Sequence, residues 1–139
     1  APFERNKEFG GRGQPEHVPP EALNFRTKGQ PGENTTLVVV VTDATLTKAQ
    51  TRRLAIMAQD GMSRALRPIH TPLDGDIVFA AATCERTLRD PPYGLAELGA
   101  LAADTVARAI ARGVYEAKAL PFAGAQPSWR DKFATGSIR

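Results

Sequence analysis

The chain has 139 residues, 42% of them hydrophobic, and 18 Lys and Arg residues against 15 Asp and Glu residues give it a formal net charge of +3. Since domains of about 100–150 residues are the commonest, we expect one domain with one core. The basic residues are spread along the chain, which argues against a nucleic-acid partner. The apolar stretches are far shorter than the ~20 residues of a membrane span, so we expect a soluble protein with no membrane partner.

The scarcity of cysteine and histidine limits disulfide and metal chemistry. Cys84 has no second cysteine to pair with, and with two histidines it cannot form a Cys/His zinc site of the usual spacing. We therefore expect no metal and no cofactor, Cys84 as a small buried hydrophobic residue, and a location compatible with the cytoplasm. The chain begins with Ala1 and lacks a signal-peptide pattern, so we expect a cut or processed start.

The first part of the chain, residues 1–33, has no strand or helix periodicity and is punctuated by Gly and Pro. It is predicted to be a loop or linker, with apolar residues such as Phe9 able to pin it to a surface. Thr35 and Thr36 then lead into the apolar run Leu37–Val41, which predicts a strand covered on both faces. Two threonine hydroxyls at the start of a rigid strand could supply a nucleophile, but β-branched residues are also common there for structural reasons alone.

The rest of the chain alternates between helix and strand patterns. Thr47 and Gln50 form a capping box before an amphipathic helix expected at about 48–66. A second apolar strand is predicted over residues 77–83, and a long helix over 95–118 with a buried stripe that includes Leu101 and Val114. The tail after Pro121 is irregular, with Trp129 as its anchor to the body or to a neighbouring subunit.

Asp74, Gly75 and Asp76 stand directly before the second strand, as the two threonines stand before the first. If the two strands are neighbours and parallel, Thr35 and the two carboxylates meet. The alternative is a simple turn, in which Asp bonds its own backbone and Gly takes a positive φ.

Four segments together resemble the L-aminopeptidase/D-esterase family over residues from about 32 to 118. They are Asn34-Thr35-Thr36 before the valine strand, Asp60-Gly61 in the first helix, residues 67–76 (Arg-Pro-Ile-His-Thr-Pro-Leu-Asp-Gly-Asp), and Leu98-Gly99-Ala100 with Ala103-Asp104 in the last helix. This family includes β-peptidyl aminopeptidases, a nylon-oligomer hydrolase and a pantetheine hydrolase of carbapenem biosynthesis.

The resemblance implies a precursor that cuts itself between Asn34 and Thr35, so that residues 1–34 end the larger subunit and residues 35–139 form the smaller one. Thr35 would be the nucleophile, with its own α-amine as base, and Asp74 and Asp76 would position the nucleophile and the amine. The fold implied is α/β, the smaller half of a four-layer α/β/β/α sandwich. The larger subunit would supply a lysine and an asparagine, and processed pairs would assemble into a homo-oligomer.

Three functions from different classes fit these residues. The first is a self-processing hydrolase of a small-molecule amide, such as a pantetheine-like amide, or an aminopeptidase on short peptides. The second is an acyltransferase of the ornithine-acetyltransferase type, which also self-cleaves at a threonine. The third is a non-catalytic binding domain, which alone predicts an intact Asn34–Thr35 bond.

Overall fold

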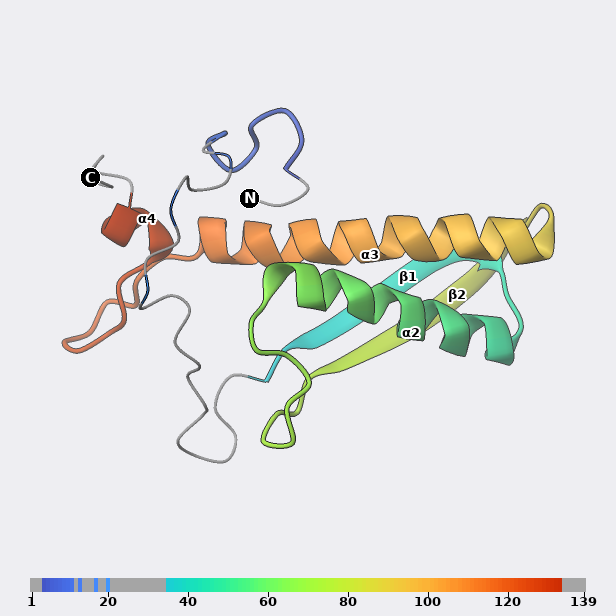
Figure 1. Cartoon of the computed structure of the whole chain (residues 1–139), viewed down its shortest axis with the longest axis horizontal. Coiled ribbons are helices and arrows are strands. Elements are labelled where there is room, and N and C mark those ends of the chain that lie inside the picture. Colours follow the sequence, from blue (N-terminus) through green and yellow to red (C-terminus); the bar gives the residue numbers. More distant parts are fainter. Residues whose placement is uncertain (1–3, 12, 14–16, 18–19, 21–34, 134–139) are drawn as a thin grey trace.

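The computed structural model describes residues 4–11, 13, 17, 20 and 35–133. The predicted cleavage residue Asn34 and the other residues of the predicted linker lie outside this part of the chain. The chain order is strand, helix, strand, helix, followed by one short helix (Figure 1). The elements are β1 (Leu37–Thr45), α2 (Lys48–Ala65), β2 (Ile77–Thr87), α3 (Pro91–Glu116) and α4 (Trp129–Phe133). This alternation confirms the predicted α/β class.

The two strands are neighbours and parallel, as the site prediction required. Their register begins at Leu37 opposite Ile77 and runs evenly to Thr42 opposite Ala82. It then shifts, because Ala44 pairs with Arg86 and leaves extra residues on β2. Cys84 lies in this irregularity with a φ of 62° and is exposed, so the expectation of a buried Cys84 is wrong. A left-handed backbone removes a residue from the regular pleat and turns its side chain out of the core.

Both long helices cover the same face of the sheet (Figure 1). The apolar core lies between them and the strands, and Leu54 and Met62 of α2 are its largest fully buried side chains. From the sheet, Val78 is buried and Val38, Val40 and Ala80 pack against this cluster. The described residues thus form two layers, helices on a sheet.

The opposite face of the sheet is apolar and exposed. Its side chains are Leu37 (69% exposed), Val39 (67%), Val41 (63%) and Phe79 (53%). The expectation of a strand covered on both faces is therefore not met within the described chain. A continuous apolar run is typical of two-sided burial, and here the described residues cover only one face of the strand. The four-layer sandwich is likewise not confirmed.

The observed bounds of α2 agree closely with the predicted ones, and those of α3 agree less well. The capping box forms as expected, since Gln50 N donates to Thr47 Oγ1 (3.3 Å) and Thr47 N donates to Gln50 Oε1 (2.8 Å). α3 begins at Pro91, four residues before the expected start, because proline fits the first turn of a helix. Leu101 and Val114 of α3 are each 50% exposed, so the predicted buried stripe is wrong at these positions. The buried residues of α3 are Gly99, Ala102, Ala103, Val106 and Ala107.

Small residues allow α2 and α3 to approach closely. A Cβ added at Gly61 of α2 would lie 2.1 Å from the carbonyl oxygen of Ala103 on α3, and one at Gly99 would lie 2.1 Å from Met57 Cε. Arg64 and Asp104 form an ion pair between the same two helices. The backbones therefore touch where the sequence has Gly61 and Ala103, and the core depends on this contact.

The tail packs on the body through aromatic rings. Trp129 lies 5.5 Å from Tyr115 of α3 and 5.6 Å from Phe133, as measured between ring centroids. Trp129 thus anchors the tail to its own body, and the predicted irregular tail contains the five-residue helix α4. Among the described helices, none combines the length and the apolarity needed to cross a membrane.

The substitution Gly61→Ala should destabilise the fold, because its methyl group would collide with a backbone carbonyl rather than with a movable side chain. We expect the free energy of unfolding to fall by about 1–3 kcal/mol. The control is Gly113→Ala in α3, where nothing lies within 4 Å of the added Cβ. That change should raise stability by about 0.5–1 kcal/mol, because alanine is the better helix residue. Urea midpoints measure both, and equal shifts in the two variants would contradict the close helix contact.

Candidate functional site

The starts of the two parallel strands bring the predicted site residues together. Asp76 Oδ1 accepts a 2.7 Å hydrogen bond from the Thr36 backbone N–H, and Ile77 N donates to Thr36 O at 3.1 Å. The second oxygen of Asp76, Oδ2, accepts from His70 N at 3.3 Å. One half-buried carboxylate therefore joins the start of β1 to the loop before β2. This contact lies one residue from Thr35.

The Thr35 side chain lies directly over Gly75. A Cβ added at Gly75 would be 2.8 Å from Thr35 Oγ1 and 3.2 Å from its Cγ2. Gly75 does not have the positive φ that would require glycine, so the turn expectation is wrong at this point. The absence of a side chain is needed instead to make room for the threonine. Thr35 itself is an exposed residue.

Asp74 has a different environment from Asp76. Its Oδ2 accepts from Thr71 Oγ1 at 3.4 Å, and its N–H donates to Thr71 O at 2.9 Å. These bonds close a turn from Thr71 to Asp74, which differs from the turn alternative because the Asp74 carboxylate bonds a threonine side chain here rather than its own backbone. The structure thus places Asp76 against the backbone beside Thr35 and gives Asp74 a role in shaping the loop that carries Gly75.

Sequence reasoning missed Gly75 and His70 as parts of this site. The sequence around Gly75 is typical of a turn, and the close contact of Gly75 with Thr35 becomes visible only once the strand register is known. His70 contributes to the site through its backbone N–H, which binds Asp76, and a pattern of side chains cannot predict such a contact. His70 has a φ of 55°, and this left-handed conformation lies within the loop that runs to Asp76.

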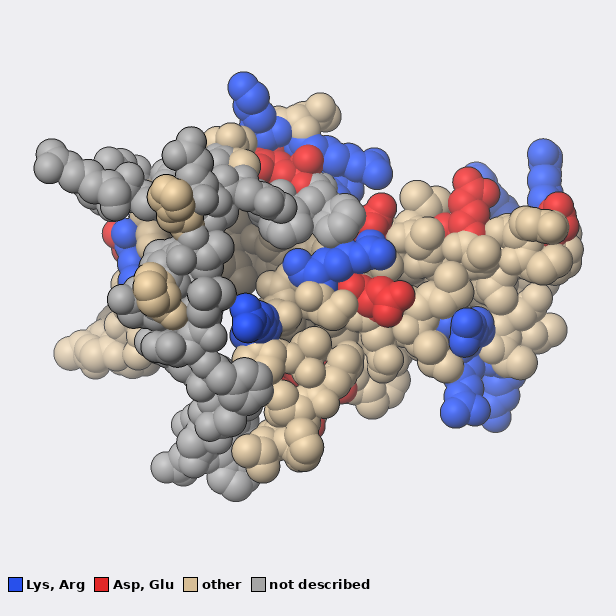
Figure 2. Space-filling view, in the orientation of Figure 1, with Lys and Arg blue, Asp and Glu red and all other residues tan. Residues whose placement is uncertain are grey.

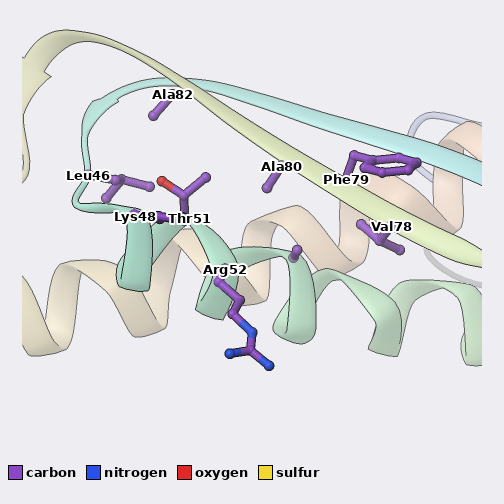
Figure 3. Close-up of a pocket in the computed structure, with 9 residues that line it drawn as sticks. Leu46, Lys48, Thr51, Arg52, Val78, Phe79, Ala80 and Ala82 are labelled. Carbon is purple, nitrogen blue, oxygen red and sulfur yellow. The ribbon is translucent and has the colours of Figure 1, made fainter.

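A groove elsewhere on the molecule does not contain these residues. It has a volume of about 420 Å³ and lies between β2 and the first turns of α2 (Figure 3). Its lining is Leu46, Lys48, Thr51, Arg52, Ala55, Val78, Phe79, Ala80 and Ala82. Thr35, Asp74 and Asp76 are absent from this lining, and in the close-up the Arg52 side chain points away from the sheet.

Neither the charges nor the potential metal ligands of the described residues mark another functional site. On the face shown in Figure 2, basic side chains lie beside acidic ones rather than in a broad basic field. Within residues 4–11, 13, 17, 20 and 35–133, no three His, Cys, Asp or Glu side chains come together as possible metal ligands. At the strand starts, the Thr35 hydroxyl lies near the Asp76 carboxylate, which binds the backbone N–H groups of Thr36 and His70.

A hydroxyl at the start of a strand with a carboxylate on the adjoining strand has the parts of a hydrolase site. The model of peptidase family S58 matches residues 5–126. The chain therefore belongs to peptidase family S58, which confirms the family resemblance seen in its motifs.

Three relatives show how much of a longer protein this chain represents. An uncharacterized aminopeptidase of Mycobacterium tuberculosis is 45% identical over 112 residues, which cover 72% of this chain and 31% of the relative. An uncharacterized aminopeptidase of Mycobacterium leprae is 47% identical over 97 residues, covering 63% of this chain and 27% of the relative. A 6-aminohexanoate-oligomer endohydrolase of Paenarthrobacter ureafaciens is 34% identical over 59 residues, or 42% of this chain and 17% of the relative. The chain spans less than a third of the length of each.

Asp76→Asn tests the local geometry without assuming any activity. Asparagine keeps one acceptor oxygen but places an NH2 group where the second oxygen was, so one of the two backbone N–H groups loses its partner. Hydrogen bonds to charged groups contribute about 1.5–3 kcal/mol, so we expect amide exchange at Thr36 or His70 to accelerate by about 10- to 100-fold. Amide exchange followed by NMR measures this, with Asp60→Asn on the exposed side of α2 as control. Unchanged exchange at both amides would contradict the bridging role of Asp76.

Proposed function

We propose that this chain carries the nucleophile of a self-processing amide hydrolase, with Thr35 exposed by cleavage of the Asn34–Thr35 bond. Residues 1–34 would end the larger subunit, and residues 35–139 would form the smaller one. The observation that carries the proposal is the position of Thr35 Oγ1 over Gly75, beside the Asp76 contact to Thr36. Membership of a peptidase family supports it independently.

The proposed cut is an acyl shift followed by hydrolysis. Thr35 Oγ would attack the carbonyl carbon of Asn34, and the C–N bond would break as its nitrogen takes the hydroxyl proton. The resulting ester would react with water, which gives a carboxylate on Asn34 and restores the Thr35 hydroxyl. The cut leaves a free α-amine on Thr35, and such an amine has a pKa of about 7.7–8.0.

The Thr35 hydroxyl and the Thr35 α-amine would then act together on the substrate. The Thr35 amine would take the hydroxyl proton while Oγ attacks the amide carbonyl carbon, and it would return the proton to the departing amine. Water would resolve the Thr35 ester and release the acid. Asp76 would hold the start of β1 so that Oγ stays over Gly75, and Asp74 would maintain the loop from Thr71.

We further propose a small linear amide as the substrate. The resemblance at Asn34-Thr35 favours a pantetheine-like amide, which would release pantothenate and a cysteamine-bearing product. The names of the relatives extend this to amino-acid amides, short peptides and linear oligoamides. All of these share an unactivated amide bond that a threonine ester mechanism can open.

The partner we propose is the remainder of the precursor. Exposed apolar side chains on one sheet face, with Val39 and Phe79 at its centre, form a surface that water-soluble proteins normally cover. A second sheet from the larger subunit would complete the four-layer α/β/β/α sandwich on this face and supply the lysine and the asparagine of the site. Processed pairs would then assemble into a homo-oligomer.

The cleavage step can be tested by substitution in the full-length precursor. Thr35→Ala removes the attacking oxygen, so the chain should stay uncut, whereas Thr35→Ser keeps a hydroxyl and should still cut. Gly75→Ala should slow the cut by about 10²-fold or more, because its methyl group displaces Thr35 Oγ1 and misplaced reacting groups react that much more slowly. Gly113→Ala is the control, and denaturing gels with time measure the cut. Normal cutting of Gly75→Ala would contradict the proposed positioning.

The substrate class can be tested by trapping the ester. Processed protein mixed with pantetheine should gain the mass of a pantothenoyl group on Thr35, as located by peptide mass spectrometry. An amino-acid amide, a short peptide and N-acetylornithine complete the panel. If only the peptide or the amino-acid amide labels Thr35, the hydrolase proposal stands and the pantetheine choice is wrong. If the label passes to an added amine instead of to water, the protein is an acyltransferase.

A further inference from the structure

A short segment upstream of the proposed cut lies on the C-terminal half of α3. Glu8 forms a two-pronged ion pair with Arg108, from Nε to Oε1 at 2.9 Å and from Nη2 to Oε2 at 3.0 Å. Arg112 Nη2 donates to Glu8 Oε2 at 2.6 Å. The Glu8 side chain is only 14% exposed. These contacts join residues about 100 positions apart in the chain.

An apolar contact reinforces the ion pairs. Phe9 is 5% exposed and meets Tyr115 of α3 edge to face, with ring centroids 5.8 Å apart. The Arg112 guanidinium lies 5.4 Å from the centroid of the Phe9 ring. Aromatic and cation–π contacts of this geometry are each favourable, and both point to a docked side chain rather than a passing contact.

The segment is also folded for this contact. Glu4 Oε1 accepts hydrogen bonds from Phe9 N (2.7 Å) and Gly11 N (2.9 Å), which closes a loop around Glu8. Gly10 N donates to Lys7 O at 3.0 Å within that loop. Residues 4–11 therefore present Glu8 and Phe9 together as a compact unit, and Glu4 holds the unit in shape.

The receiving surface on α3 needs a carboxylate. Arg108 and Arg112 lie one helical turn apart, so their like charges face each other and disfavour an empty site. Glu8 lies between them and bonds both. Its ion pair with Arg108 is the main reason that the pKa of Glu8 is lowered to about 2, and the same pair raises the pKa of Arg108.

The two sides of this contact lie on opposite sides of the proposed cut in the sequence. Residues 4–11 precede the Asn34–Thr35 bond and α3 follows it, so a cut at that bond leaves no covalent link between them within this chain. We infer that Glu8 and Phe9 form a clasp by which the end of the upstream subunit stays bound to α3 of the downstream subunit after processing. This inference rests on the proposed cleavage.

The clasp should hold at neutral pH. The pKa of Glu8 is about 2 in the folded state, below its unfolded value of about 4.3. The ion pair therefore contributes its full stabilisation at pH values above about 4.3. The effect is lost as the pH falls toward 2, where Glu8 becomes protonated. Measurements at pH 7 therefore examine the closed clasp.

The test is amide exchange at Phe9 and Gly11, the two N–H groups bonded to Glu4. It is measured at pH 7 on the processed full-length protein and on the uncut Thr35→Ala precursor. We expect both amides to be protected in both forms. Glu8→Gln and Phe9→Ala should each reduce the protection by about tenfold or more in the processed form. The control is Asp43→Asn, which removes an ion pair of the sheet, to Arg86 Nε at 3.0 Å, and leaves the residues that contact the segment unchanged.

The outcomes separate the clasp from the cleavage. If the two amides are protected in the uncut precursor but lose protection on processing, the clasp is overturned and the cut still stands. The same conclusion follows if Glu8→Gln exchanges at the rate of the unmutated protein. A wild-type protein that never cuts would overturn the proposed function and the post-cleavage role of the clasp. A pairwise test with Arg108→Gln adds specificity, because the effects of Glu8→Gln and Arg108→Gln should not add if the two side chains act as a pair.

Discussion

The parallel pairing of β1 with β2 is the constraint on which the rest of the structure depends. Because the pairing begins at Leu37 opposite Ile77, the residues just before each strand must lie side by side. Thr35 then lies over Gly75, and Asp76 reaches the Thr36 amide. Parallel strands need a crossover between them, and α2 supplies it while packing on the sheet face that it shares with α3. The site is thus a consequence of register rather than of local sequence alone.

α3 connects this site region with the upstream segment. Its middle packs against α2 at Gly61 and Ala103, where the backbones are close enough to exclude a Cβ. Its C-terminal half carries Arg108 and Arg112, which hold Glu8. One helix therefore supports the sheet that positions Thr35 and also binds the chain that precedes Thr35. This arrangement suits a protein that must keep its shape after its backbone is cut, as we propose.

Much of the fold and part of the site could be predicted from sequence. The capping box at Thr47 predicted the start of α2, and the two apolar runs predicted both strands. The meeting of Thr35 with the aspartates was conditional on neighbouring, parallel strands, and the structure meets that condition. The strand ends extended further than predicted, to Thr45 and Thr87, because polar residues continue the pairing after the apolar signal stops. The exposure of one sheet face could not be predicted, because an apolar run favours burial but does not say which residues would cover each face. Gly75 and Glu8 were missed because each acts through a contact distant in sequence.

We propose that Thr35, held over the loop before β2, cuts the bond that precedes it and thereby becomes an N-terminal nucleophile. The most direct measurement is the intact mass of freshly purified full-length wild-type protein, combined with N-terminal sequencing of any smaller piece. The account predicts two pieces and a new N-terminus reading Thr-Thr-Leu-Val from Thr35. A single uncut chain after long incubation, or a cut at any other bond, would contradict it.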